Sequence, residues 1–79
     1  MKLGVYNLKK VLFQGEIELL TCTTVTGEIT VLSHHRPLLS MLKEGTLRIV
    51  DSSKKEHFIP VVSGFLEVSS HNEVTCVVD

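Results

Sequence analysis

Short runs in which apolar and polar residues alternate, separated by Gly, Pro or polar clusters, occupy most of the 79-residue chain. Alternation with a period of two is typical of β-strands that bury one face. The runs recur every 8–12 residues or so, which predicts an all-β domain built as a meander in a sandwich or barrel. Strands are predicted over residues 3–8, 11–13, 16–25, 29–32, 46–50, 57–62, 65–68 and 74–78.

The connections between these runs carry turn chemistry. Thr26-Gly27-Glu28 predicts a tight hairpin turn, and Ser33–Pro37 predicts a loop, since Pro37 lacks a backbone donor and biases Arg36 toward extended geometry. Pro60 indicates an edge strand or a bulge, because a central strand needs every backbone N–H. Bends therefore divide the chain at regular intervals.

Two further segments interrupt the alternation. Gln14-Gly15 predicts the end of the strand over 11–13, because Gly can supply a positive φ. Residues 38–42 fit either one helical turn beginning at Pro37 and stopping at Gly45, or an extended segment that covers the end of a sheet. The local pattern leaves both forms open.

Composition supports strands and bounds the size of the domain. Val, Ile and Thr total 22 residues, there is no Ala or Trp, and β-branched side chains favour pleated strands over helices. A chain of 79 residues has room for one hydrophobic core, so residues 1–79 are expected to form a single domain. The net charge of −1 argues against a nucleic acid or an anionic membrane surface held by charge alone.

No apolar run approaches the roughly 18 residues that a membrane-spanning helix needs, and residues 1–4 do not begin a secretory signal. Cys22 and Cys76 lack the spacing of metal ligands and lie in strand-like runs. Buried free thiols of a cytosolic protein are the favoured interpretation. A disulfide stays open, because the sequence does not tell whether the two strands adjoin.

No motif indicates catalysis or a metal site. His34 and His35 are adjacent, and adjacent side chains of an extended chain point to opposite faces, so they do not readily hold one ion together. Ser63-Gly64 lacks the preceding Gly and the following helix of a nucleophile elbow. The five Gly residues are too scattered for a phosphate-binding loop. We therefore expect no catalytic residue, no metal and no cofactor.

Paired apolar residues leave a binding face as the remaining functional signal. Leu19-Leu20, Val31-Leu32, Leu38-Leu39 and Val61-Val62 each place apolar atoms on both sides of a strand. Burial of both sides within a sandwich explains such pairs. The alternative is an exposed apolar patch that docks on another protein, because one small core does not cover every apolar side chain.

Ordered motifs along nearly the whole chain resemble the N-terminal domain of the F-type ATP synthase epsilon subunit. The matching residues are, in chain order, Phe13-x-Gly15, Thr26-Gly27-Glu28, His35-x-Pro37-Leu38-Leu39-Ser40-x-Leu42-Lys43-x-Gly45-x-Leu47-Arg48-Ile49, Phe58-Ile59, Ser63-Gly64-Phe65-Leu66-Glu67-Val68 and Val74-Thr75. Ser33-His34 stands where the family usually has a Gly, and Arg36 where a small residue is common. The resemblance does not extend to the family's C-terminal helical hairpin, which inhibits ATP hydrolysis, so we expect no self-inhibitory switch.

The resemblance implies a flattened β-sandwich of about eight to ten short, mostly antiparallel strands. It implies a non-catalytic subunit of the central stalk, the rotor, which binds gamma and the c-ring and couples proton translocation to ATP synthesis. Such a subunit lies peripherally at the cytoplasmic face of a bacterial-type energy-coupling membrane. The competing hypothesis is a free-standing β-sandwich module that binds a peptide or ligand along a sheet edge.

The resemblance also implies partner-binding residues. By position, Glu28 and the loop of His34, His35 and Arg36 are similar to the end that faces the c-ring. His35, Leu38, Leu39 and Ser40 are similar to the region near gamma. An exposed ion pair contributes only up to about 1 kcal/mol, so apolar contact must supply most of the affinity.

Overall fold

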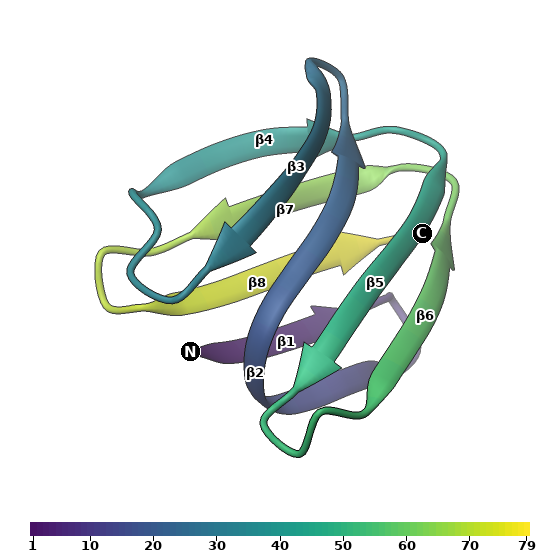
Figure 1. Cartoon of the computed structure of the whole chain (residues 1–79). Helices are drawn as coiled ribbons and strands as arrows, with labels where there is room; N and C mark the ends of the chain where they lie inside the picture. The colour runs from purple at the N-terminus through teal and green to yellow at the C-terminus, as the bar shows by residue number, and fades with distance from the viewer.

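The computed structural model describes residues 1–79 and contains eight strands and no helix (Figure 1). The all-β prediction is confirmed. The strands are β1 (Lys2–Tyr6), β2 (Val11–Thr24), β3 (Gly27–Leu32), β4 (Leu38–Leu42), β5 (Gly45–Asp51), β6 (Glu56–Val61), β7 (Gly64–Val68) and β8 (Glu73–Val78).

The strands form one hydrogen-bonded sheet that folds over on itself into two layers. One layer contains β3, β2, β5 and β6, and the other contains β4, β7, β8 and β1. In Figure 1 the first set runs up and down the view, and β4, β7 and β8 cross it. The principal extents are 26 × 24 × 19 Å, so the sandwich is thinnest in one direction.

The long strand β2 belongs to both layers. Its first residues, Val11–Glu16, pair with β1, whereas residues from Ile17 onward pair with β5 and those from Leu19 onward with β3. The register shifts between Ile17 and Leu19, and a bulge of this kind lets a strand bend. The predicted end of the strand at Gln14-Gly15 was wrong, because pairing to β1 continues through Gly15.

The order of strands departs from the predicted meander. β1 lies beside β8, in a parallel pair that joins the two ends of the chain, and β2 lies beside β5. The other pairs are antiparallel, as expected. β6 ends the path of strands, so Pro60 lies in an edge strand, where a missing backbone donor is tolerated.

Residues 38–42, left open between helix and strand, form β4. Leu38 to Leu42 pair antiparallel with Val68 to Gly64 of β7, which satisfies the backbone groups that a single helical turn would leave unpaired. The β2–β3 turn is also displaced from its predicted position. Val25 and Thr26 form the turn, whereas Gly27 already belongs to β3 and pairs with Thr24. The φ of Gly27 is 123°.

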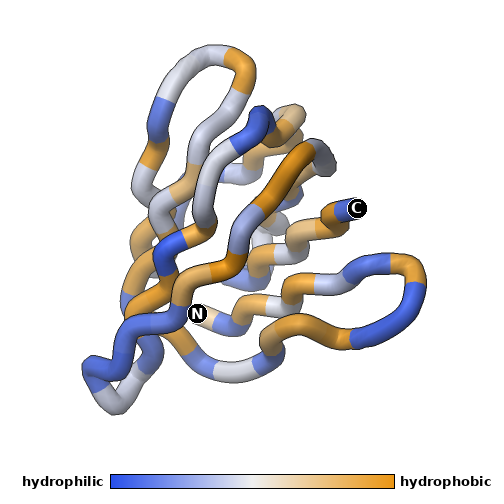
Figure 2. Tube along the Cα trace, turned by 90° about the vertical axis from the view of Figure 1, so that its right-hand side faces the viewer, coloured by the Kyte–Doolittle hydropathy of each residue, from blue (hydrophilic) through white to orange (hydrophobic).

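Fifteen buried apolar residues from both layers form one core. The largest fully buried members include Leu3, Leu20, Leu47, Ile49 and Leu66. Figure 2 shows apolar segments along the strands and hydrophilic ones at several of the connections.

Cys22 and Cys76 are both buried and free, so the structure contains no disulfide. Burial and the nearby Glu28 raise the pKa of the Cys22 thiol to about 11. Burial and the neighbouring Cys22 raise the pKa of the Cys76 thiol to about 12. Both thiols therefore stay protonated near neutral pH, and the predicted free buried thiols are confirmed.

One carboxylate organises the β5–β6 turn. Asp51 Oδ1 accepts hydrogen bonds from the backbone N–H groups of Ser53 and Lys55 at 2.9 and 3.0 Å, and Oδ2 lies 2.8 Å from His57 Nε2. The bond to His57 lowers the pKa of Asp51, and the bond from Lys55 adds to the effect. Lys54, in the same turn, adopts a left-handed backbone conformation with a φ of 71°.

Replacement of Leu20 by Ala tests the position of the core. Leu20 is 0% exposed in β2, so Leu20→Ala removes buried methyl groups and leaves a cavity. We expect the free energy of unfolding, measured by urea denaturation, to fall by about 2–5 kcal/mol. Leu8, which is fully exposed in the β1–β2 turn, supplies the matched control, and Leu8→Ala should change stability by less than about 0.5 kcal/mol. Equal losses would contradict this core.

Candidate interaction site

A row of apolar side chains crosses the outer face of the β4, β7, β8 and β1 layer. Met41 pairs with Phe65, Phe65 with Val77, and Val77 with Tyr6, one residue from each strand. Leu39 lies two residues from Met41 on the same face of β4. We call these five residues the apolar stripe.

The stripe is exposed although its members are apolar. Leu39 is 72% exposed, Met41 61% and Phe65 46%. Leu66, which follows Phe65 in β7, points to the opposite face and is fully buried in the core. A hollow of about 380 Å³ is lined by Leu39, Ser40, Met41 and Phe65. Contiguous exposed apolar surface of this kind makes the stripe a candidate docking surface.

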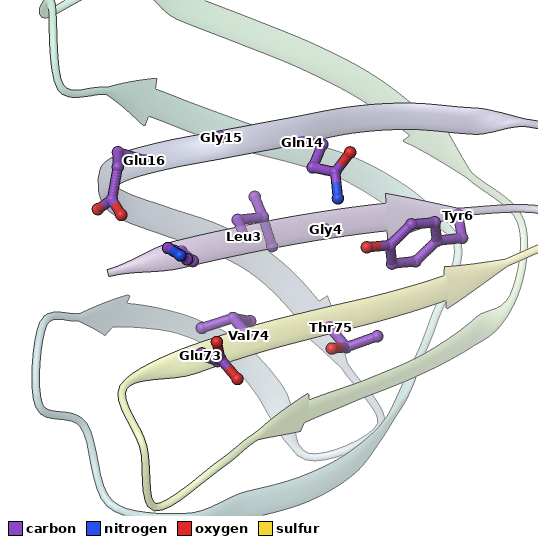
Figure 3. A pocket seen from close by; sticks show the side chains of 10 residues that line it. Leu3, Gly4, Tyr6, Gln14, Gly15, Glu16, Glu73, Val74 and Thr75 are labelled. Atoms are coloured by element: carbon purple, nitrogen blue, oxygen red, sulfur yellow. The ribbon is translucent and has the colours of Figure 1, made fainter.

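At the β1 end, the stripe is bordered by an open polar groove. The Tyr6 ring lies over Gly4, and a Cβ at Gly4 would collide with the Tyr6 hydroxyl. Figure 3 shows the ring leaning along β1, with Gln14 on one side and Thr75 on the other. The groove has a volume of about 370 Å³ and is open along the sheet surface. Tyr6 thus covers backbone that Gly4 leaves bare.

The β2–β3 hairpin carries Glu28 and is joined to β4. Thr24, a buried polar residue, locks the hairpin because its Oγ1 donates to the Gly27 carbonyl at 2.8 Å and accepts from the Thr26 N–H at 3.2 Å. The Val25 N–H donates to the Met41 carbonyl at 3.1 Å, which joins the hairpin to β4. Glu28 is exposed, so its carboxylate is available to a partner.

The loop of His34, His35 and Arg36 lies at the other end of β3. It is held by Asn72 of the β7–β8 loop, whose Oδ1 accepts from the His34 N–H at 2.7 Å and whose Nδ2 donates to Ser33 Oγ at 3.1 Å. His34 and Asn72 both adopt positive φ, 65° and 60°. His35 Nδ1 lies 2.7 Å from the Arg36 carbonyl, so this nitrogen carries the proton that it donates.

The expected c-ring-facing residues do not share one end of the molecule. Glu28 lies beside the hairpin turn, whereas His34, His35 and Arg36 follow Leu32 at the far end of β3. Leu32 is four positions after Glu28, which corresponds to roughly 13 Å of strand. Grouping Glu28 with that loop was wrong, because residues close in sequence lie at opposite ends of a strand.

The residues expected near gamma divide between two faces of β4. Leu39 belongs to the stripe, whereas Leu38 packs against the core and Ser40, half-buried, lies on the same face of β4 as Leu38. Met41, Phe65, Val77 and Tyr6 were not predicted from the sequence. Alternation of Leu39 and Met41 was the available signal, but it became readable only once residues 38–42 were known to be a strand.

The structure contains no group of three or more His, Cys, Asp or Glu side chains that could hold a metal ion. It also contains no helix with the length and apolar character needed to cross a membrane.

Comparison with known families identifies the family to which this fold and this chain belong. The family described as "ATP synthase, Delta/Epsilon chain, beta-sandwich domain" matches residues 1–79. The chain belongs to this family. The resemblance noted from the sequence motifs is therefore confirmed for the domain as a whole.

Curated relatives in the delta/epsilon family are named ATP synthase epsilon chain. The protein from Psychrobacter cryohalolentis is 41% identical over 64 residues, which cover 81% of this chain and 46% of the relative. The protein from Dichelobacter nodosus is 35% identical over 65 residues, covering 82% and 46%. The chain thus spans about half the length of these relatives.

Solved structures with the same fold belong to ATP synthase assemblies. A chain of the Euglena gracilis mitochondrial ATP synthase, in a structure that includes the c-ring, matches with a TM-score of 0.89 at 22% identity, covering 96% of this chain and 48% of that one. A chain from the central stalk and c-ring of Tetrahymena thermophila matches with a TM-score of 0.84 at 16% identity, covering 99% and 62%. At these identities the likeness concerns the fold.

Two glycines of the stripe layer should respond differently to Ala. Gly64 has a φ of 155°, and a Cβ there would collide with the Val77 carbonyl oxygen, so Gly64→Ala should lower the free energy of unfolding by at least about 1 kcal/mol. A Cβ at Gly4 meets only the movable Tyr6 ring, so Gly4→Ala should cost less and mainly displace the ring. Urea denaturation and the near-ultraviolet spectrum of the single Tyr test both expectations. An unchanged Tyr spectrum in Gly4→Ala would contradict the stacked ring.

Proposed function

We propose that this domain acts as part of an epsilon subunit in the central stalk of an F-type ATP synthase. In that position it couples proton translocation to ATP synthesis as a rotor component and catalyses no reaction itself. It lies at the cytoplasmic face of a bacterial-type energy-coupling membrane, held there by its partner subunits. Membership of the delta/epsilon family supports the role, and the apolar stripe is the observation that carries it.

The proposed occupant of the stripe is the gamma subunit. A rotor component must move with its shaft, and a stable contact needs a desolvated apolar centre with a polar rim. The stripe offers such a centre across four strands, because Met41, Phe65 and Val77 are neighbours in the sheet. Backbone hydrogen bonds fix these positions, so the docked surface is rigid.

The proposed c-ring contact lies on the β2–β3 hairpin. Glu28 is exposed there, and the hairpin joins the stripe through the Val25–Met41 hydrogen bond. A partner on the stripe and a partner on the hairpin can therefore touch the domain at the same time. Glu28 would pair with a basic group on a ring loop.

The loop of His34, His35 and Arg36 leads directly into β4 at Leu38. We assign this loop to the gamma side, since Leu39 follows it on the stripe and Glu28 is at the far end of β3. Leu38 and Ser40 then support the stripe from the core side of β4. Their contribution is to position Leu39 and Met41.

A free-standing module that binds a peptide or small ligand is the second candidate. The groove beside Tyr6 is the observation that favours it, since Gln14, Thr75 and Tyr6 place polar groups around it. The groove lies open on the sheet, whereas small-molecule sites usually enclose most of their ligand. The stripe is therefore the better-supported surface.

Replacement of Met41 by Asp tests the gamma contact. Met41 is 61% exposed, so Met41→Asp should leave the thermal midpoint nearly unchanged. A carboxylate in a desolvated apolar centre should weaken binding to purified gamma by at least about tenfold in a calorimetric titration.

Leu8→Asp places the same charge on an exposed apolar residue outside the stripe and serves as the control. Its affinity for gamma should match that of the unaltered chain. Equal weakening by both variants, or no weakening by Met41→Asp, would exclude the stripe as the gamma site. Failure of the unaltered chain to bind gamma, with a peptide or ligand retained instead, would favour the second candidate.

Replacement of Glu28 by Lys tests the c-ring contact. An exposed ion pair contributes up to about 1 kcal/mol, so Glu28→Lys should weaken binding of the chain–gamma complex to purified c-ring by about fivefold at low salt. The difference should shrink as salt rises, because exposed charges are screened. Glu73→Lys, at the start of β8, is the charge-matched control. If Glu28→Lys does not weaken binding to the c-ring at low salt, the assignment of Glu28 to the c-ring contact is refuted.

A further inference from the structure

A side-chain clasp closes the sheet next to the apolar stripe. The Asp79 N–H donates to the Ser63 carbonyl at 3.3 Å, while Asp79 Oδ1 accepts from the Ser63 N–H at 3.1 Å and Oδ2 accepts from Ser63 Oγ at 3.0 Å. We call these three hydrogen bonds the Asp79 clasp. The bonds from the Ser63 backbone and hydroxyl lower the pKa of Asp79.

The clasp lies where the chain passes between layers. β6 belongs to one layer and β7 to the other, so the bend at Val62 and Ser63 is the crossover between them. The last pair of the β7–β8 ladder joins Gly64 to Val78, and the clasp follows as the next pair. It extends the ladder by one step with a side chain.

The ladder that the clasp closes carries the centre of the stripe. Phe65 and Val77 form the pair next to Gly64 and Val78, two steps from the clasp. Gly64 packs so closely on the Val77 carbonyl that no side chain fits, yet Gly also gives the backbone its greatest freedom. Without the clasp, this end of the ladder would fray, because terminal pairs open most readily.

We infer that Asp79 is a positioning residue for the apolar stripe: through Ser63 it fastens the β6–β7 crossover to β8 and so holds Phe65 and Val77 in line for a docking partner. The inference rests on the proposed docking function of the stripe. Asp79 itself need not touch the partner. Its carboxylate acts through the backbone of the bend.

The test compares Asp79→Ala with Asp51→Ala. Both residues are aspartates that accept backbone hydrogen bonds at a turn, but Asp51 lies at the β5–β6 turn in the layer without the stripe. Asp79→Asn is the conservative variant, because its amide can still accept from the Ser63 N–H and bond the hydroxyl. Two quantities are measured for each variant: affinity for purified gamma, and amide hydrogen exchange of residues 62–66 and 77–78.

Asp79→Ala should speed exchange in those segments and weaken gamma binding by at least about fivefold, and Asp79→Asn should restore most of the affinity. Asp51→Ala should speed exchange only around residues 52–57 and leave the affinity within about twofold. Affinities are measured well below each thermal midpoint, so that global unfolding does not contribute. A general loss of stability would lower affinity in both Ala variants alike.

Three results would overturn the inference: unchanged exchange at residues 62–66 in Asp79→Ala, unchanged affinity despite faster exchange, or equal losses of affinity in the two Ala variants. If the unaltered chain does not bind gamma, the docking proposal fails on that measurement alone. The exchange data then still decide whether Asp79 holds the stripe in place. The two failures are therefore distinguishable.

Discussion

The bent strand β2 is the constraint on which the rest of the structure depends. It hydrogen-bonds to β1 along its first residues and to β3 and β5 along its later ones, and it meets β4 at Thr24. Because one strand serves both layers, the sheet folds over a single core. The bulge between Ile17 and Leu19 permits the change of direction while Ile17 and Leu20 both remain buried.

Closure of the sheet leaves apolar side chains on the outer face of one layer. Fifteen apolar residues fill the core of this small domain, and the alternation of β4, β7 and β8 then turns Met41, Phe65 and Val77 outward. In a two-layer sandwich the core covers only the inner face of each layer, so the alternate side chains point outward. The exposed side chains lie in neighbouring strands, so they form one surface that a partner can cover.

Polar contacts at the turns determine how rigid that surface is. Thr24 locks the hairpin, Asn72 joins two loops, and the clasp between Ser63 and Asp79 closes the β7–β8 ladder. Each satisfies backbone groups that would otherwise depend on water alone, and each acts beyond the end of a strand. None contributes much to the hydrophobic core. Their role is to fix the geometry of connections beside the proposed docking surfaces.

The sequence by itself determined the fold class, because period-two alternation and β-branched composition act locally. It favoured buried free thiols but did not fix the strands: the predicted runs 11–13 and 16–25 form the single strand β2, and residues 38–42 were left open between helix and strand. Its ordered motifs also indicated the delta/epsilon family. Only the tertiary structure decided that β2 continues through Gly15, that β1 lies parallel to β8, and that Glu28 is far from His34. The tertiary structure was also needed to recognise the apolar stripe, since its members are distant along the chain: Tyr6, Met41, Phe65 and Val77. Strand pairing brings such residues together, and local pattern does not encode which strands pair.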